Sequence, residues 1–203
     1  MTSYATAYVP DTTRRVEAVH SHASELSDEQ LMAQICKHDE EAFTCLLGRH
    51  LNPVHAYLYR LTGSRADAED LAQDTFLRVW RKASSFRPGG VKLATWLHRI
   101  AHNLCVDEFR KRRARVVLNL DELSEEPNHP APREEECENL ELLNVALMGL
   151  PESQRSALVL CQIQDFSNQE AADILGVSVS ALESLLARAR RRLKRELPEH
   201  LRT

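Results

Sequence analysis

Residues 162–195 read QIQDFSNQEAADILGVSVSALESLLARARRRLKR, and this segment decides the fold of the chain. Ser167 and Glu170 have the spacing of a capping box, in which the two side chains bond the free backbone amides at the start of a helix. Gly176 suits the left-handed position that ends such a helix. Ser178 is placed to cap a second helix. The segment therefore predicts a helix-turn-helix with a long second helix.

The second helix, which we expect to run to about Leu197, presents two faces when residues are laid out at about 100° each. One face is apolar and is predicted to pack inward; it comprises Leu182, Leu186, Ala189 and Leu193. Short polar groups and arginines occupy the other face, where they suit the major groove of DNA. The residues with predicted DNA contacts are Ser180, Glu183, Ser184, Ala187, Arg188, Arg191 and Arg192. The alternative is an amphipathic helix with a merely solvated basic face.

Composition narrows the class of protein. The 203 residues suffice for one large domain or two small ones, and the chain is 43% hydrophobic. The net charge of −4 requires any nucleic-acid contact to come from local patches. Five scattered cysteines without a CxxC motif argue against a disulfide framework. Because no apolar run is long enough for a membrane span or signal peptide, we expect a cytoplasmic protein without direct membrane insertion.

The N-terminal part of the chain predicts helices as well. Residues 1–25 show no hydrophobic period, and we expect a disordered tail there. Ser27 is placed to cap a first helix, and Asp39 or Glu40 begins a longer one. The longer helix is predicted to pack through Phe43, Leu46, Leu47, Leu51, Val54, Leu58 and Leu61.

Residues 65–83 predict a third helix with two faces. Its apolar face comprises Ala68, Ala72, Phe76, Val79 and Ala83. Acidic residues fill its first turns and basic residues its last, an order that complements the helix dipole without any partner. The acidic row and the residues beside it are Asp67, Asp70, Asp74, Leu71, Gln73 and Trp80. This face equally predicts a docking surface for a basic groove.

A long helix is expected from Leu93 to about Arg115. Its inward residues are predicted to be Leu93, Leu97, Ile100, Ala101 and Leu104. A second face combines an aromatic ring, an amide and a basic cluster, as in proteins that stack bases and hold a single strand. The residues of that face and cluster are Trp96, Arg99, Asn103, Asp107, Arg110, Lys111, Arg112 and Arg113.

The third side of the same helix carries His98, His102 and Cys105, a spacing that would place three metal ligands together. No fourth ligand is evident nearby. We therefore favour packed or hydrogen-bonded core residues, and we predict neither a metal site nor another cofactor.

Residues 116–137 contain three prolines and an excess of acids, which predict an acidic linker. A helical period returns from about Glu138. We find no Gly-rich phosphate loop and no ordered Ser-His-Asp set. This pattern favours a binding protein over an enzyme.

These motifs together resemble the bacterial RNA polymerase sigma factors of the extracytoplasmic-function (ECF) group of the sigma-70 family. Three segments carry the resemblance: DAEDLAQDTFLRVW, TWLHRIAHNLCVDEFRKRR, and LPESQRSALVLCQIQDFSNQEAADILGVSVSALESLLARARRRLK. In that family the first segment docks on the clamp helices of the polymerase β′ subunit. The second recognises and opens the minus-ten promoter element, and the third reads the minus-thirty-five element.

The resemblance implies an all-α fold of two small helical domains joined by an acidic flexible linker. The region 2 domain would cover residues 26–115, and the region 4 helix-turn-helix domain residues 138–203. Core RNA polymerase (β′ clamp helices and β subunit), promoter DNA and an anti-sigma factor are the implied partners. The expected polymerase-binding residues are Asp67, Asp70, Leu71, Gln73, Asp74, Phe76 and Trp80.

The alternative is a stand-alone helix-turn-helix regulator whose N-terminal helices dimerise or sense a ligand. Such regulators usually bind paired half-sites as dimers. The sequence shows no coiled-coil heptads, and a second DNA-facing helix would be superfluous in a simple repressor. The sigma-factor interpretation therefore accounts for more of the chain.

Overall fold

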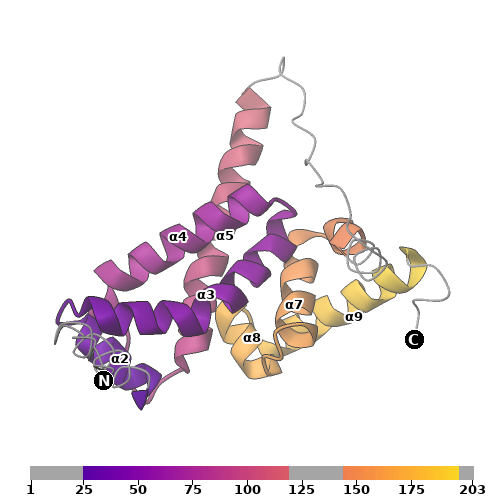
Figure 1. Ribbon diagram of the computed structural model, residues 1–203. Helices are drawn as coiled ribbons and strands as arrows, with labels where there is room; N and C mark the ends of the chain where they lie inside the picture. Colours follow the sequence, from indigo (N-terminus) through magenta and orange to yellow (C-terminus); the bar gives the residue numbers. More distant parts are fainter. Residues whose placement is uncertain (1–24, 119–143, 197–203) are drawn as a thin grey trace, which may run out of the picture.

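A computed structural model describes residues 25–118 and 144–196 of the chain, and every regular element in these two ranges is a helix (Figure 1). All but the last residue of the predicted tail and all but the first three residues of the predicted linker lie outside the described residues. The elements are α2 (Asp28–Ile35), α3 (Glu40–Thr62), α4 (Arg65–Arg81), the 3₁₀ turn η1 (Ala83–Ser85), α5 (Leu93–Leu118), α7 (Glu152–Gln162), α8 (Asn168–Leu175) and α9 (Val179–Glu196). Residues 144–148 form a further helical turn.

The helix boundaries follow local capping chemistry. Ser27 caps α2 with a complete capping box, and the Asp39 carboxylate accepts bonds from two amides of the first turn of α3. Gly63 ends α3 at a φ of 70°, in the left-handed region that favours glycine. The predicted starts of these two helices are confirmed. α5 continues to Leu118, three residues beyond its predicted end at Arg115.

An N-terminal unit forms where α2, α4 and α5 pack around α3. The predicted stripe of α3 is largely buried, but Leu51 is 40% exposed, so its prediction as a core residue is wrong. Tyr57, which lies outside that stripe, is fully buried. The difference arises because α3 contacts four helices, α2, α4, α5 and α7, whereas a single-stripe pattern describes packing against only one.

A C-terminal unit is formed by α7, α8 and α9 and contains the predicted helix-turn-helix. Ser167 and Glu170 form the predicted capping box, and Gly176 ends α8 at a φ of 65°. Leu182, Leu186 and Ala189 of α9 are buried, as predicted.

The two units pack directly against each other. α8 contacts α5 and α7 contacts α3, so the buried residues of both units form one continuous core. Figure 1 shows α7 and α8 beside the N-terminal helices, while the end of α5 and most of α9 project from the body. The sequence predicted the two units but not this packing.

Candidate nucleic-acid and partner interfaces

The outer face of α9 is arranged as the sequence predicted. Ser180, Glu183, Ser184, Ala187, Arg188 and Arg191 are all exposed, and Arg192 is half-buried. The Nε atoms of Arg188 and Arg191 donate to helix carbonyls four residues earlier, at 3.1 and 3.2 Å. The arginine stems are therefore held along the helix, and their terminal nitrogens remain available for other acceptors.

A basic hollow of about 640 Å³ adjoins this face. It is lined by Gln154, Arg188, Arg191, Arg192 and Arg195. Gln154 comes from α7 and was not predicted, because no pattern in α9 identifies a residue from another helix. The concentration of arginines suits the phosphate backbone of DNA.

A second, smaller hollow of about 140 Å³ opens between α4, η1 and α5. It brings the predicted Trp96 and Asn103 together with residues that the sequence did not single out. Its lining is Arg78, Lys82, Ser85, Trp96, Ile100 and Asn103. Trp96 is half-buried against Phe86, with 5.5 Å between ring centroids, and Asn103 is exposed. The hollow therefore offers an aromatic wall, an amide and two cations.

Two arginines of the basic cluster at the end of α5 form ion pairs with acidic side chains of other helices. Arg112 donates to Asp67 of α4 at 2.6 Å, and this bond lowers the pKa of the Asp67 carboxyl. Arg113 pairs with Glu152 of the C-terminal unit. Asp67 was predicted to contact polymerase, but here its carboxylate faces α5. The ion pair leaves Asp67 half-buried, and its contact with polymerase stays a prediction.

The other residues of the predicted docking face of α4 differ in their exposure to solvent. Asp70, Gln73 and Asp74 are exposed, as a docking surface requires. Leu71 and Phe76 are only 7% and 3% exposed, so they belong mainly to the core, and their contact with polymerase stays a prediction. Their burial follows from the position of α4, which packs on both α3 and α5.

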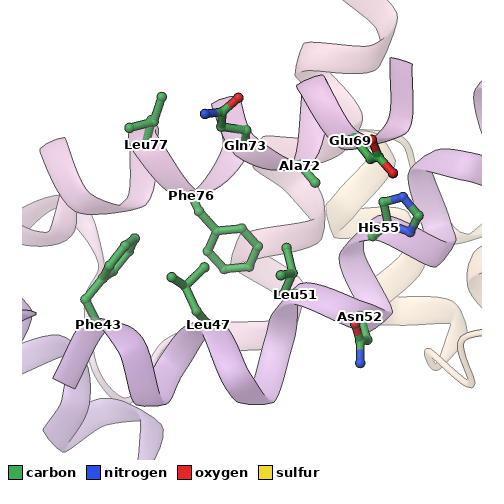
Figure 2. Close-up of a pocket in the computed structure, with 10 residues that line it drawn as sticks. All are labelled: Phe43, Leu47, Leu51, Asn52, His55, Glu69, Ala72, Gln73, Phe76 and Leu77. Carbon is green, nitrogen blue, oxygen red and sulfur yellow. The ribbon is translucent and has the colours of Figure 1, made fainter. Parts of the chain in front are cut away.

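An apolar groove of about 500 Å³ separates α3 from α4 and continues this face. Figure 2 shows side chains from both helices converging on it, with Phe76 between the two. Its lining is Phe43, Leu47, Leu51, Asn52, His55, Glu69, Ala72, Gln73, Phe76 and Leu77. The exposed Leu51 and Leu77 stand at this groove, which explains the failure of the core prediction for Leu51. The Trp80 ring packs edge-on against the ring of Phe43, with 5.0 Å between ring centroids.

The His98, His102 and Cys105 side of α5 is packed core, as favoured from the sequence. His98 is 2% exposed and its Nδ1 bonds the Ala94 carbonyl at 2.9 Å, while His102 Nδ1 lies 3.0 Å from the Tyr57 hydroxyl. Burial lowers the pKa of both histidines to about 4 and raises that of the Cys105 thiol to about 12. No group of metal-ligating side chains is arranged for an ion within the described ranges.

Within residues 25–118 and 144–196, each helix is either too short or too polar to cross a lipid bilayer.

Two protein-family models match the chain. The model for Sigma-70 region 2 matches residues 46–115, and the model for Sigma-70, region 4 matches residues 140–193. The chain is 38% identical over 175 residues to the ECF RNA polymerase sigma factor SigM of Mycobacterium tuberculosis, which covers 85% of this chain and 86% of that protein. It is 36% identical over 159 residues to the ECF sigma factor SigE of Mycolicibacterium smegmatis, covering 76% of this chain but only 61% of that protein.

Solved structures give the same result. The sigma factor RpoE in complex with the anti-sigma factor NepR from Bartonella quintana is similar with a TM-score of 0.68 and 31% identity, over 75% of this chain and 94% of that one. CnrH in complex with the cytosolic domain of CnrY is similar with a TM-score of 0.64 and 29% identity, over 83% of this chain and 96% of that one.

Proposed function

Because the chain belongs to the ECF group of the sigma-70 family, we propose that it binds core RNA polymerase and directs promoter-specific initiation by recognising and melting promoter DNA. The observation that carries this proposal is the presence of two separate surfaces suited to binding DNA, one beside α5 and one on α9. A stand-alone regulator needs only one such surface. The acidic and apolar face of α4 supplies a third surface, suited to a protein partner.

Three surfaces receive roles under this proposal. The hollow of α4, η1 and α5 holds the minus-ten element, and the outer face of α9 reads the minus-thirty-five element. The face of α4 docks on the β′ clamp helices. The protein acts in the cytoplasm as an initiation factor without catalytic activity of its own. An anti-sigma factor restrains it, a partner suggested by the complexes of RpoE with NepR and of CnrH with CnrY.

Mixing the purified chain with core polymerase tests the proposal directly. Co-elution, together with promoter-dependent transcripts that core enzyme alone does not make, is the expected result. If the chain bound DNA tightly but did not bind core polymerase, the result would instead support the interpretation as a stand-alone regulator.

Reversing the charge of Asp70 and Asp74 together should weaken association with core polymerase. Both side chains are exposed on α4, and single surface ion pairs contribute less than about 1 kcal/mol, so both changes are needed for a clear effect. Competition with the wild-type chain for limiting core enzyme measures the loss. The same reversal at the exposed Glu29 and Glu41 of α2 and α3 is the matched control. If both double variants lost the same affinity for core polymerase, this face of α4 would not be part of the interface.

Arg188→Ala should cost about 1–3 kcal/mol of promoter binding and relax the choice of base at one position of the minus-thirty-five element. Arg188 is exposed on the outer face of α9, to which the proposal assigns base reading. Arg190→Ala, also at an exposed arginine, is the control and should weaken all sequences alike, as loss of a phosphate contact does. Selection from a promoter library distinguishes the two patterns. If Arg188→Ala lowered the binding of all promoter sequences equally, Arg188 would not be a base-reading residue.

A further inference from the structure

The apolar groove between α3 and α4 is left uncovered by the part of the chain that the structure describes (Figure 2). Leu51 and Leu77, one from each helix, stand at the groove and are 40% and 41% exposed. The lining extends along α3 from Phe43 to His55, which is about 18 Å at 1.5 Å per residue. Because exposed apolar surface of this kind is unfavourable in water, the groove suits an apolar occupant.

The groove also contains an atom that needs a hydrogen-bond partner. His55 Nε2 is buried, and no group within residues 25–118 and 144–196 bonds it. A buried polar atom without a partner is destabilising, so an occupant that brings a hydroxyl to this nitrogen gains affinity. Tyrosine meets both requirements, because it buries an apolar ring and carries a hydroxyl at its tip.

A segment of the chain itself has this chemistry. Residues 4–9 read YATAYV, an uncharged stretch with Tyr4 and Tyr8 four positions apart. The sequence shows no helical period here, and an extended segment does not require one. Six residues of extended chain span about 20 Å, which is close to the length of the groove.

Charge favours the same occupant. Arg14 and Arg15 follow the segment, and Arg14 lies within about 17 Å of Val9 even in a fully extended chain. Asp70 and Asp74 are exposed on α4, the helix that forms one wall of the groove. A segment bound in the groove therefore brings two cations towards two acids, and opposite charges attract.

The chain enters the described structure close to the groove. The carboxylate of Asp28, the first residue of α2, lies 2.7 Å from His50 Nε2 on α3. His50 is three positions from Leu47, which lines the groove, and residues three apart are neighbours on a helix surface. Residues 10–24 can span up to about 50 Å, more than twice the length of the groove. The segment can therefore reach its site within one chain.

We propose that residues 4–9 bind in the groove between α3 and α4 of the same chain, with the two tyrosine rings on Leu51 and Leu77 and one hydroxyl bonded to His55 Nε2. Gln73 lines the groove and belongs to the α4 face to which the proposed function assigns polymerase docking, so the bound segment competes with core polymerase. The competition rests on the proposed function, whereas binding of the segment does not. A tethered segment meets its site at about 1 mM, so an intrinsic dissociation constant of about 0.1 mM keeps about nine molecules in ten occupied.

Leucine methyl NMR spectra of the full chain test the binding. Tyrosine rings on the groove shift the methyl signals of Leu51 and Leu77, so Tyr4→Ala combined with Tyr8→Ala should move both signals. Thr12→Ala combined with Thr13→Ala changes the same part of the chain and should leave them in place. Unchanged signals in the tyrosine variant would overturn the proposal. A difference that disappears on dilution would also overturn it, because the segment would then come from a second copy.

Competition for limiting core polymerase tests the inhibition. Because only molecules with an empty groove bind, the double tyrosine variant should outcompete the wild-type chain by about tenfold. The double threonine variant is the control and should compete equally. Equal competition by the tyrosine variant would overturn the inhibitory role. If no form of the chain bound core polymerase, the proposed function would fail, and the methyl signals would still decide whether the segment occupies the groove.

Discussion

Lowering the pH from 7.5 to 5 is expected to reduce the free energy of unfolding by about 4 kcal/mol, about 2 kcal/mol for each of two buried histidines. Burial holds the pKa of His98 and His102 at about 4 in the folded protein, against an ordinary value of 6.5. Between these two values the unfolded chain binds protons that the folded chain excludes. Stability is therefore complete above about pH 6.5 and is lost as the pH falls towards 4.

The groups around the histidines support this direction. His98 faces the Tyr57 and Phe166 rings, and the charge on His50 further disfavours its protonation. Glu152 favours protonation of His102, but desolvation is the larger effect. The Glu170 carboxyl, whose pKa is about 2, contributes to acid sensitivity only below about pH 4.5 and so lies outside the tested range.

Urea unfolding at the two pH values measures the effect, and His98→Phe provides the control. Phenylalanine keeps the ring contacts with Tyr57 and Phe166 but cannot take up a proton. The pH-dependent loss should therefore fall by about half in this variant. An unchanged loss in His98→Phe would show that His98 is not one of the groups responsible.

Asn103→Ala should leave closed-complex formation intact and reduce promoter melting by roughly tenfold to hundredfold, the equivalent of about 1–3 kcal/mol. Asn103 is exposed in the hollow that also contains Trp96, Arg78 and Lys82. A base can enter this hollow only after leaving the duplex stack, which costs a few kcal/mol. Hydrogen bonds from the amide to the exposed base edge would offset part of that cost, and the two cations lie where they can hold the strand.

Permanganate footprinting of the holoenzyme on linear and pre-melted promoters distinguishes melting from binding. Thymine reactivity should fall on the linear template and return on the pre-melted one. Gln162→Ala, which truncates an exposed amide at the end of α7, should behave as wild type. Normal reactivity of Asn103→Ala on the linear template would exclude Asn103 from strand opening.

The candidate sites could be predicted to different extents. The exposed face of α9 was predicted almost entirely, because a single amphipathic helix displays that face in its own periodicity. For the hollow beside α5, the sequence predicted Trp96 and Asn103 but missed Arg78, Lys82 and Ser85. Arg78 lies in α4, Ser85 in η1 and Lys82 between the two, so only the packing of this segment on α5 places them there.

The sequence by itself determined the helices, their caps and the two units. Ser27, Asp39, Ser167 and Gly176 act within a few residues of their own positions, so local spacing is sufficient to identify them.

Only the tertiary structure decided which polar groups meet. Asp67 pairs with Arg112 across 45 positions, and Arg155 bonds the Leu61 carbonyl across 94. The same packing buried Tyr57 and left Leu51 at a groove. A local hydrophobic period specifies that a face will be covered but not which element covers it. The packing of the two units therefore depends on contacts between distant segments, which no single stretch of the sequence encodes.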